Sequence, residues 1–304
     1  MLSFSFNEFG TAFPWFFPVV AAVIGACVGS FLNVVIYRLP REESIVTPGS
    51  HCACGQPIKW HDNIPVLSWI LLRGRARCCG RPFSFRYPFV ELLTALLFLA
   101  AWLQFPPTVA IAVWIFLGSL VAATFIDLDH MIIPDVFTVG LAVAGVLLAV
   151  AIPALHGQAE GFYLVDGLRA VTAAVRGMLI GSGLVLWIAL LAEAVLKKEA
   201  MGFGDVKFVG AIGAFCGWEG AVFSVFGGAI VGTIWFAVAW SWEKATGHRA
   251  AVAPPTETPE GEPAPLGFGA HLPFGPMLAI AAVLYLLLFR APAQAWLEEV
   301  AVLF

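Results

Sequence analysis

Two acidic strings in the sequence have the residue types needed for one catalytic pair. Asp205 ends the glycine-flanked string Gly202-Phe203-Gly204-Asp205, and Asp127 follows a charge-free apolar run. A carboxylate beside a long apolar segment is costly, so it is a functional-site hypothesis whose partner must be found. Two aspartates that share one proton supply the base that activates water and the acid that protonates a scissile carbonyl, as in aspartic proteases. Gly202 and Gly204 would let a peptide approach closely.

The alternative interpretation gives both strings a structural role. Asp127, Asp129 and Asp135 share a short link between two apolar runs, and Asp205 precedes another run. Asp135 and Asp205 stand where residues that cap helices are found. A GxGD string matches by chance easily when it is alone. It becomes specific when a second acid lies at the same depth.

Four of the six cysteines form two close pairs, Cys52 with Cys54 and Cys78 with Cys79. In a reducing compartment, two such pairs more often indicate a tetrathiolate zinc site than disulfides. The CxC and CC spacings differ from the CxxC pairs of ordinary zinc ribbons, so His51 is an alternative ligand to Cys52. The other interpretation is a set of reduced thiols packed in a small loop. Cys27 and Cys216 lie in apolar runs and are expected to be small core residues.

Composition indicates an integral membrane protein. Hydrophobic residues make up 60% of the chain and charged residues 12%, against about 25% charged residues in average soluble domains. The mean hydropathy is +0.90. The net charge of -4 and the lack of a basic tract with interleaved aromatics argue against a nucleic-acid partner, and make the lipid bilayer the expected surroundings.

Apolar runs of suitable length predict an all-α polytopic membrane protein with about eight transmembrane helices. The first run lacks the basic flank of a signal peptide, so it is predicted to be a retained helix. The sixth run is short for a transmembrane helix, and the seventh begins two residues after it ends. The eight runs are 13–37, 90–105, 108–126, 136–155, 177–196, 208–218, 220–242 and 272–289.

Basic residues predict the orientation. If the N-terminus is periplasmic, 13 of the 16 lysines and arginines face the cytoplasm, in agreement with the positive-inside rule. The exceptions are Arg169, Arg176 and Arg290. Omitting the short sixth run would place Lys244 and Arg249 on the wrong side. The same tally puts Asp127 and Asp205 at the same depth, at the cytoplasmic face.

The runs also predict three parts of the chain. Residues 1–38 form the first transmembrane helix, 39–87 a small cytoplasmic loop domain that contains the cysteines, and 88–304 a membrane core. Within the core, residues 243–271 are expected to form a flexible cytoplasmic loop, because much of this stretch is rich in proline, glycine and glutamate. The connection 156–176 is expected to lie on the external side.

Five further residues are candidates for supporting roles. Glu91 could bind a basic peptide, stabilise the loop, or simply be an acid favoured at a helix N-terminus. Lys207 could hold Asp205 ionised or contact substrate, or it could be an interfacial lysine. Asp129 lies beside Asp127. Pro273 and Gly275 break the start of the last run, where irregular backbone is tolerated only if it faces protein or a cavity.

Six ordered strings resemble the bacterial type IV prepilin peptidases, which are GxGD membrane aspartyl proteases. The strings are GSFLNVVIYRLP at 29–40, NIPVLSW at 63–69, RYP at 86–88 with Glu91, ID at 126–127 followed by IPD at 133–135, GFGDVK at 202–207, and PFGP at 273–276. The resemblance implies that Asp127 and Asp205 are the catalytic pair and that Asp129 and Asp135 have supporting roles at most.

The same resemblance implies the reaction and its location. The family, in the bacterial inner membrane, cuts prepilins or type II secretion pseudopilins after a glycine that ends a short basic leader, at the cytoplasmic face. Bifunctional members then methylate the new N-terminus with S-adenosylmethionine. No glycine-rich nucleotide fingerprint is present, so both the methylation and this cofactor rest on the resemblance alone.

Two other classes of function fit part of the pattern. In a proton-coupled transporter the same acids would relay protons, but acids would then be expected at several depths, whereas these gather at one face. A non-catalytic scaffold with a metal-binding loop would explain the cysteines and leave Asp127 and Asp205 without a role.

Overall fold

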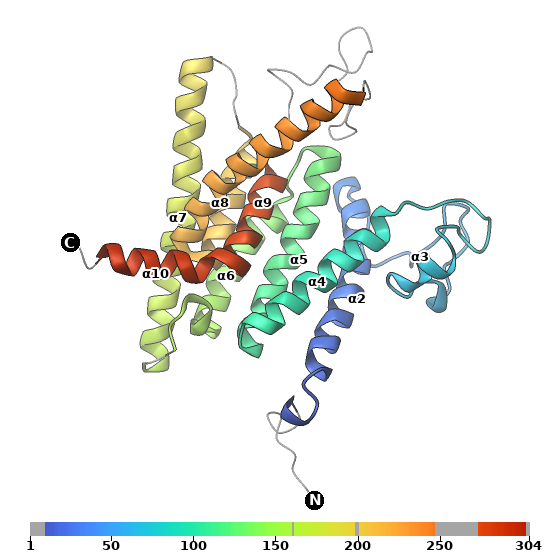
Figure 1. The fold of residues 1–304 in the computed structure, drawn as a ribbon, viewed down its shortest axis with the longest axis horizontal. Coiled ribbons are helices and arrows are strands. Elements are labelled where there is room, and N and C mark those ends of the chain that lie inside the picture. The colour runs from blue at the N-terminus through green and yellow to red at the C-terminus, as the bar shows by residue number, and fades with distance from the viewer. Residues whose placement is uncertain (1–9, 160, 198–200, 247–272, 302–304) are drawn as a thin grey trace, which may run out of the picture. The chain divides into compact units, whose positions relative to one another are not determined.

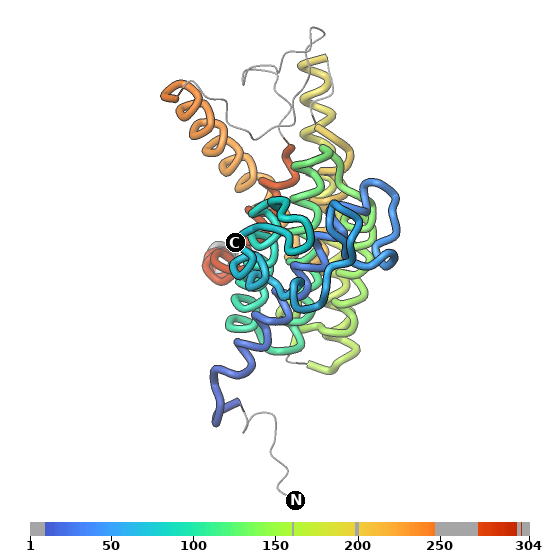
Figure 2. Tube along the Cα trace, turned by 90° about the vertical axis from the view of Figure 1, so that its right-hand side faces the viewer, coloured from blue at the N-terminus to red at the C-terminus, as the bar shows by residue number. Residues whose placement is uncertain are grey.

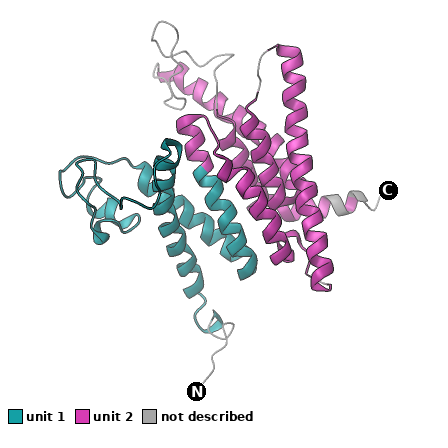
Figure 3. Ribbon diagram, turned by 180° about the vertical axis from the view of Figure 1, so that it is seen from behind, with its two compact units in different colours: residues 1–122 teal, residues 123–304 magenta. Residues whose placement is uncertain are grey.

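The computed structural model describes residues 10–159, 161–197, 201–246 and 273–301, and within these residues it has helices and no β-strand (Figure 1). The predicted all-α fold is therefore confirmed. The chain divides into two compact units, residues 1–122 and 123–304 (Figure 3). The helix α5 (Pro107–His130) begins in the first unit and ends in the second. The predicted loop at 243–271 lies outside the described residues, except that residues 243–246 belong to the end of a helix.

The first unit is built on two helices that pack closely, α2 (Phe16–Arg38) and α4 (Arg86–Gln104). Gly25 and Gly29 make the approach possible, because a Cβ at Gly25 would lie 2.7 Å from Ala95 Cα and one at Gly29 would lie 2.7 Å from Glu91 Cα. These pairings show that the helices are antiparallel. Between them runs a loop with the short helices η1 (Leu39–Arg41), η2 (Trp60–Asp62) and α3 (Leu67–Leu71).

The second unit contains the end of α5 and the helices that follow it. Its elements are η3 (Asp135–Phe137), α6 (Val139–Ala151), η4 (Pro153–His156), α7 (Tyr163–Leu196), α8 (Phe203–Thr246), α9 (Gly275–Leu284), the π-helix η5 (Tyr285–Phe289) and α10 (Arg290–Ala301). At 34 residues, α7 is about 51 Å long, which exceeds the hydrocarbon core of about 30 Å. Most of the connection expected at 156–176 is therefore the first part of this helix.

The long helix α8 reverses direction at Gly217, whose φ of 73° and ψ of -179° are not helical. Contacts with α7 show the reversal. An added Cβ at Gly177 would meet Gly213 and Gly217, while one at Gly181, a turn further along α7, would meet Val209 and Ala221. The first half of α8 is thus antiparallel to α7 and the second half parallel. In Figure 2 the orange end of α8 and the yellow end of α7 both lie at the top.

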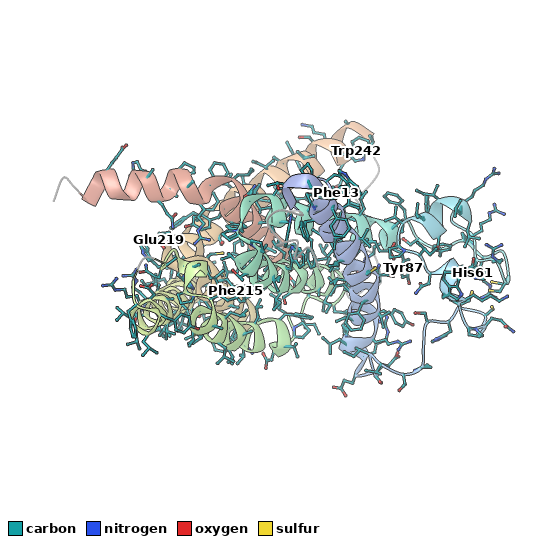
Figure 4. The ribbon with its side chains drawn as sticks, turned by 90° about the horizontal axis from the view of Figure 1, so that it is seen from below. Phe13, His61, Tyr87, Phe215, Glu219 and Trp242 are labelled. Carbon is teal, nitrogen blue, oxygen red and sulfur yellow. The ribbon has the colours of Figure 1, made fainter. Side chains whose placement is uncertain are left out.

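Side chains around the break support the turn (Figure 4, where Phe215 and Glu219 flank it). The His156 ring nitrogen Nε2 lies 3.1 Å from the Ala214 carbonyl oxygen, in the last turn before Gly217. Because a carbonyl only accepts, Nε2 carries the hydrogen. Burial lowers the pKa of His156 to about 4, so the ring is neutral near pH 7. The Arg290 guanidinium donates to the Leu155 carbonyl oxygen at 2.7 Å and joins the start of α10 to η4.

Six helical segments among the described residues are long and apolar enough to cross a membrane. They comprise α2, α4, α5, α7, α8 and the segment Gly275–Trp296, while α6 lies in a shorter apolar helical stretch, Asp135–Ala151. Adding α6 and counting the two halves of α8 separately gives the eight apolar segments predicted from the sequence. Because the chain reverses at Gly217, the single helix α8 contains two of these segments.

Candidate active site

The end of α5 positions Asp127. The helix runs to His130, and Met131 then adopts a left-handed conformation with φ 53° while its N–H donates to the Asp127 carbonyl at 2.8 Å. This helix end brings the chain into the Ile133-Pro134-Asp135 link. The Asp127 side chain stays inside, with 6% of the residue exposed. Asp129, two residues further along, is exposed.

The glycine string positions Asp205 in the first turn of α8. The N–H of Asp205 donates to the Gly202 carbonyl at 3.1 Å, and a carboxylate in a first turn is favoured by the helix dipole. Among the described residues, an added Cβ at Gly202 would have no neighbour closer than 4.0 Å, and its neighbours at that distance are Asp205 Oδ2 and the Gly204 nitrogen.

The two aspartates meet near the start of α9. The backbone N–H of Gly275 donates a hydrogen bond to the Asp127 carboxylate, and the carboxylates of Asp127 and Asp205 interact electrostatically. A Cβ at Gly275 would lie 2.6 Å from Asp127 Oδ2, so only glycine fits here. The PFGP string predicts irregular backbone at Pro273 and Gly275, at the depth of the aspartates. It does not predict that the Gly275 N–H donates to the Asp127 carboxylate.

Lys207 has a different partner from the one considered in the sequence. Its ammonium forms an ion pair with Asp135, and not with Asp205. The pair links the beginning of α8 to η3, so it holds the two acidic strings together from outside the dyad. Asp135, which the resemblance made a supporting residue at most, is therefore a structural partner of Lys207.

Glu91 lies in the first unit and supports the loop. Its Oε2 accepts a hydrogen bond from the Val66 N–H at 2.7 Å, and Ser30 also bonds to this carboxylate. Val66 has a φ of 61°, which is rare for a β-branched residue and requires support from its surroundings. Of the three roles considered for Glu91, the structure shows the loop contact.

Two residues of the string at 29–40 connect the framing helix α2 to its surroundings. The Asn33 amide donates to the Tyr87 carbonyl oxygen at 3.1 Å, which joins α2 to α4. The Arg38 guanidinium donates to the Ser44 carbonyl oxygen at 3.0 Å. The strings of the first unit thus frame the loop that carries the cysteines.

The four loop cysteines come together. Cys52 Sγ lies 3.6 Å from Cys79 Sγ, Cys54 Sγ lies 3.4 Å from Cys78 Sγ, and all four sulfurs are within 4.8 Å of one another. A tetrahedral site with Zn–S bonds of about 2.3 Å has sulfurs about 3.8 Å apart, so the cluster fits a metal ion. The His51 ring instead contacts the Gly49 carbonyl oxygen at 3.1 Å, and the cluster does not include it.

The thiols of this cluster influence one another. A hydrogen bond from the Cys54 backbone lowers the pKa of Cys52 to about 7. Hydrogen bonding to Cys52 raises the pKa of Cys78 to about 12. Because a metal ion binds thiolates, metal binding at this cluster would release thiol protons.

Two family models match the chain. The bacterial peptidase A24 N-terminal domain matches residues 23–105, and the type IV leader peptidase family matches residues 114–237. The first match covers the loop with its framing helices, and the second covers both aspartates. No solved structure matches the chain at a significant level.

Curated relatives extend the similarity over most of the chain. A prepilin leader peptidase/N-methyltransferase of Myxococcus xanthus strain DK1622 is 40% identical over 254 residues, which are 82% of this chain and 69% of the relative. A type 4 prepilin-like proteins leader peptide-processing enzyme of Escherichia coli O78:H11 is 42% identical, covering 67% of this chain and 79% of the relative. A prepilin leader peptidase/N-methyltransferase of Dickeya chrysanthemi is 33% identical, covering 92% and 95%.

Proposed function

Because this chain belongs to the type IV leader peptidase family, it cleaves prepilin leader peptides, and we propose that Asp127 and Asp205 form its catalytic pair. The observation that carries the assignment is the meeting of the two carboxylates beside the Gly275 N–H. It explains why acids from two distant strings, costly in an apolar chain, face each other in one unit.

The pair performs acid–base hydrolysis. One carboxylate, ionised, takes a proton from a water molecule as the water oxygen attacks the scissile carbonyl carbon. The other, protonated, gives its proton to the carbonyl oxygen. When the tetrahedral intermediate collapses, the C–N bond breaks, the proton held by the base passes to the leaving amine, and one hydroxyl proton of the intermediate returns to the other carboxylate. The two roles belong to the coupled pair.

The substrate approaches along the glycine string. Gly202 is exposed and the space beside it is open, which leaves room for an extended peptide next to Asp205. The substrates are prepilins, and by resemblance the pseudopilins of type II secretion are of the same class. Family membership also makes the chain a multi-pass protein of the bacterial inner membrane.

The second activity is N-methylation of the new N-terminus. The relatives from Myxococcus xanthus and Dickeya chrysanthemi carry N-methyltransferase in their names. The proposed donor is S-adenosylmethionine, which would supply the methyl group to the amine that cleavage exposes. The sequence contains no glycine-rich nucleotide fingerprint, and we assign no residue to this donor.

Zinc is the metal proposed for the cysteine cluster. Four thiolates close enough for tetrahedral coordination are the usual ligands of structural zinc. Bound zinc would tie the two ends of the loop together. The carboxylate pair needs no metal for the hydrolysis described above.

Replacing Cys54 and Cys79 together by serine should remove the metal. Each residue belongs to a different thiol pair, so the double variant leaves two thiolates, which hold zinc far less tightly than four. Elemental analysis of the purified protein should fall from about one zinc per chain to near zero. The Cys27→Ser variant, changed at a thiol in α2, should keep its zinc. Full zinc occupancy in the double variant would exclude these ligands.

Sided membrane vesicles test the activity and the proposed cytoplasmic location together. We expect everted inner-membrane vesicles to cleave an added prepilin-like peptide and sealed right-side-out vesicles to leave it intact until detergent is added. Mass spectrometry detects both the cut and the added methyl group. Cleavage by right-side-out vesicles would overturn the orientation, and no cleavage in either preparation after detergent treatment would overturn the function.

A further inference from the structure

Ile133 lies beside Gly204 of the GFGD string and Gly275 of the PFGP string. A Cβ at Gly275 would lie 2.9 Å from Ile133 Cδ1, and a Cβ at Gly204 would lie 3.8 Å from Ile133 Cβ. Gly275 binds Asp127 and Gly204 precedes Asp205. The branched side chain of Ile133 therefore borders the backbone beside each carboxylate.

The space around Ile133 is closed on one side and open on the other. At Gly275 an added Cβ would be trapped between Asp127 Oδ2 and Ile133, so nothing more fits there. At Gly204, Ile133 is the only described residue that an added Cβ would meet within 4 Å, and the contact distances are ordinary. Ile133 is itself half-buried, so its remaining surface borders the open space that a peptide would occupy beside Asp205.

The chemistry of the cut determines which substrate residue meets this side chain. The carbonyl carbon attacked by water is bonded directly to the Cα of the residue on the amino side of the cleaved bond. The Cα on the carboxyl side is one atom further away, beyond the nitrogen. When the carbonyl lies between the carboxylates, the amino-side residue therefore carries the side chain closest to the dyad and to Ile133.

We infer that Ile133 determines specificity by limiting the size of the residue on the amino side of the cleaved bond. This inference rests on the proposed function. Any side chain beyond a hydrogen atom at that residue would compete with the Ile133 methyl groups for the space between Gly204 and Gly275.

The test compares three prepilin-like peptides that carry glycine, alanine or valine on the amino side of the bond. For Ile133→Ala, we expect the ratio of kcat/KM for the alanine peptide to that for the glycine peptide to rise about tenfold or more, the discrimination typical of a methyl group in an apolar pocket. Peptides varied on the carboxyl side should keep their relative rates.

Ile132→Ala is the matched control, because Ile132 is the adjacent isoleucine and is half exposed to solvent. Its peptide ratios should equal those of the unmodified protein. If Ile133→Ala loses all cleavage, Ile133→Val carries the comparison, since it removes one methyl group and should raise the same ratio to a smaller extent.

The possible outcomes separate the two proposals. If the unmodified protein fails to cut the glycine peptide, the proposed function is wrong. If it cuts that peptide but the alanine-to-glycine ratio stays the same in both Ile133 variants, or rises equally in Ile132→Ala, the inference about Ile133 is wrong and the function stands.

Discussion

Replacing either Asp127 or Asp205 by asparagine should lower kcat for a prepilin-like peptide in detergent by about 10⁴-fold or more. An amide keeps the size of the carboxyl group but neither takes a proton from water nor gives one to the carbonyl. At position 127 the amide oxygen can still accept the Gly275 N–H, so the helix end should stay in place. Because the two groups act as one unit, the double variant should lose little more than either single variant.

Two control measurements distinguish lost chemistry from lost folding. Asp129→Asn changes an exposed acid two residues from Asp127 and should retain most of the activity. Thermal unfolding in detergent should be similar for the two single variants and the unmodified protein, which shows that lost cleavage reflects lost chemistry. Cleavage that persists in both Asp127→Asn and Asp205→Asn would remove the dyad from the mechanism.

The sequence could predict that the two aspartates meet. The distribution of basic residues fixes the orientation of the helices, and this orientation puts Asp127 and Asp205 at the same membrane depth. The contacts of Lys207 and Gly275 could not be predicted. The Lys207–Asp135 pair joins a helix start to a link far away in the sequence, and spacing within one element says nothing about it. The Gly275 hydrogen bond comes from a backbone N–H, which every residue except proline has. The residue type therefore does not predict this bond.

The beginning of α7 contains a buried acid that the sequence did not reveal. Asp166 is 4% exposed and accepts a hydrogen bond from the Gly161 N–H at 2.9 Å. In the sequence, a buried acid in the first turn of a helix looks the same as an acid in a loop. The helix therefore starts at Tyr163, well before the apolar run that begins at 177.

The glycines of α7 and α8 allow these helices to approach closely. The reversal at Gly217 lets both halves of α8 lie against one face of α7, and the close approach is concentrated at a few glycines. Because Asp205 begins the first half of α8, the position of this half against α7 sets the position of the carboxylate. Helix packing in the second unit and the geometry of the dyad are therefore coupled.

Gly177→Val tests this coupling and should be among the most damaging single changes outside the dyad. An added Cβ at Gly177 would overlap the carbonyl oxygen of Gly213 and lie 2.8 Å from the Gly217 carbonyl carbon. Both obstacles are backbone atoms, so no side chain can rotate away and the helices must separate. We expect a loss of stability of about 3 kcal/mol or more, at the upper end of overpacking effects, together with lost cleavage.

Gly183→Val provides the matched comparison, since Gly183 lies on the same helix and an added Cβ there would meet none of the described residues within 4 Å. It carries the same change in helix propensity, so any difference between the two variants reports the contact with α8. Thermal unfolding in detergent and the cleavage rate should be near normal for Gly183→Val and both reduced for Gly177→Val. Equal behaviour of the two variants would show that α7 and α8 do not approach as closely as these glycines require, and the carboxylate of Asp205 would then need another support.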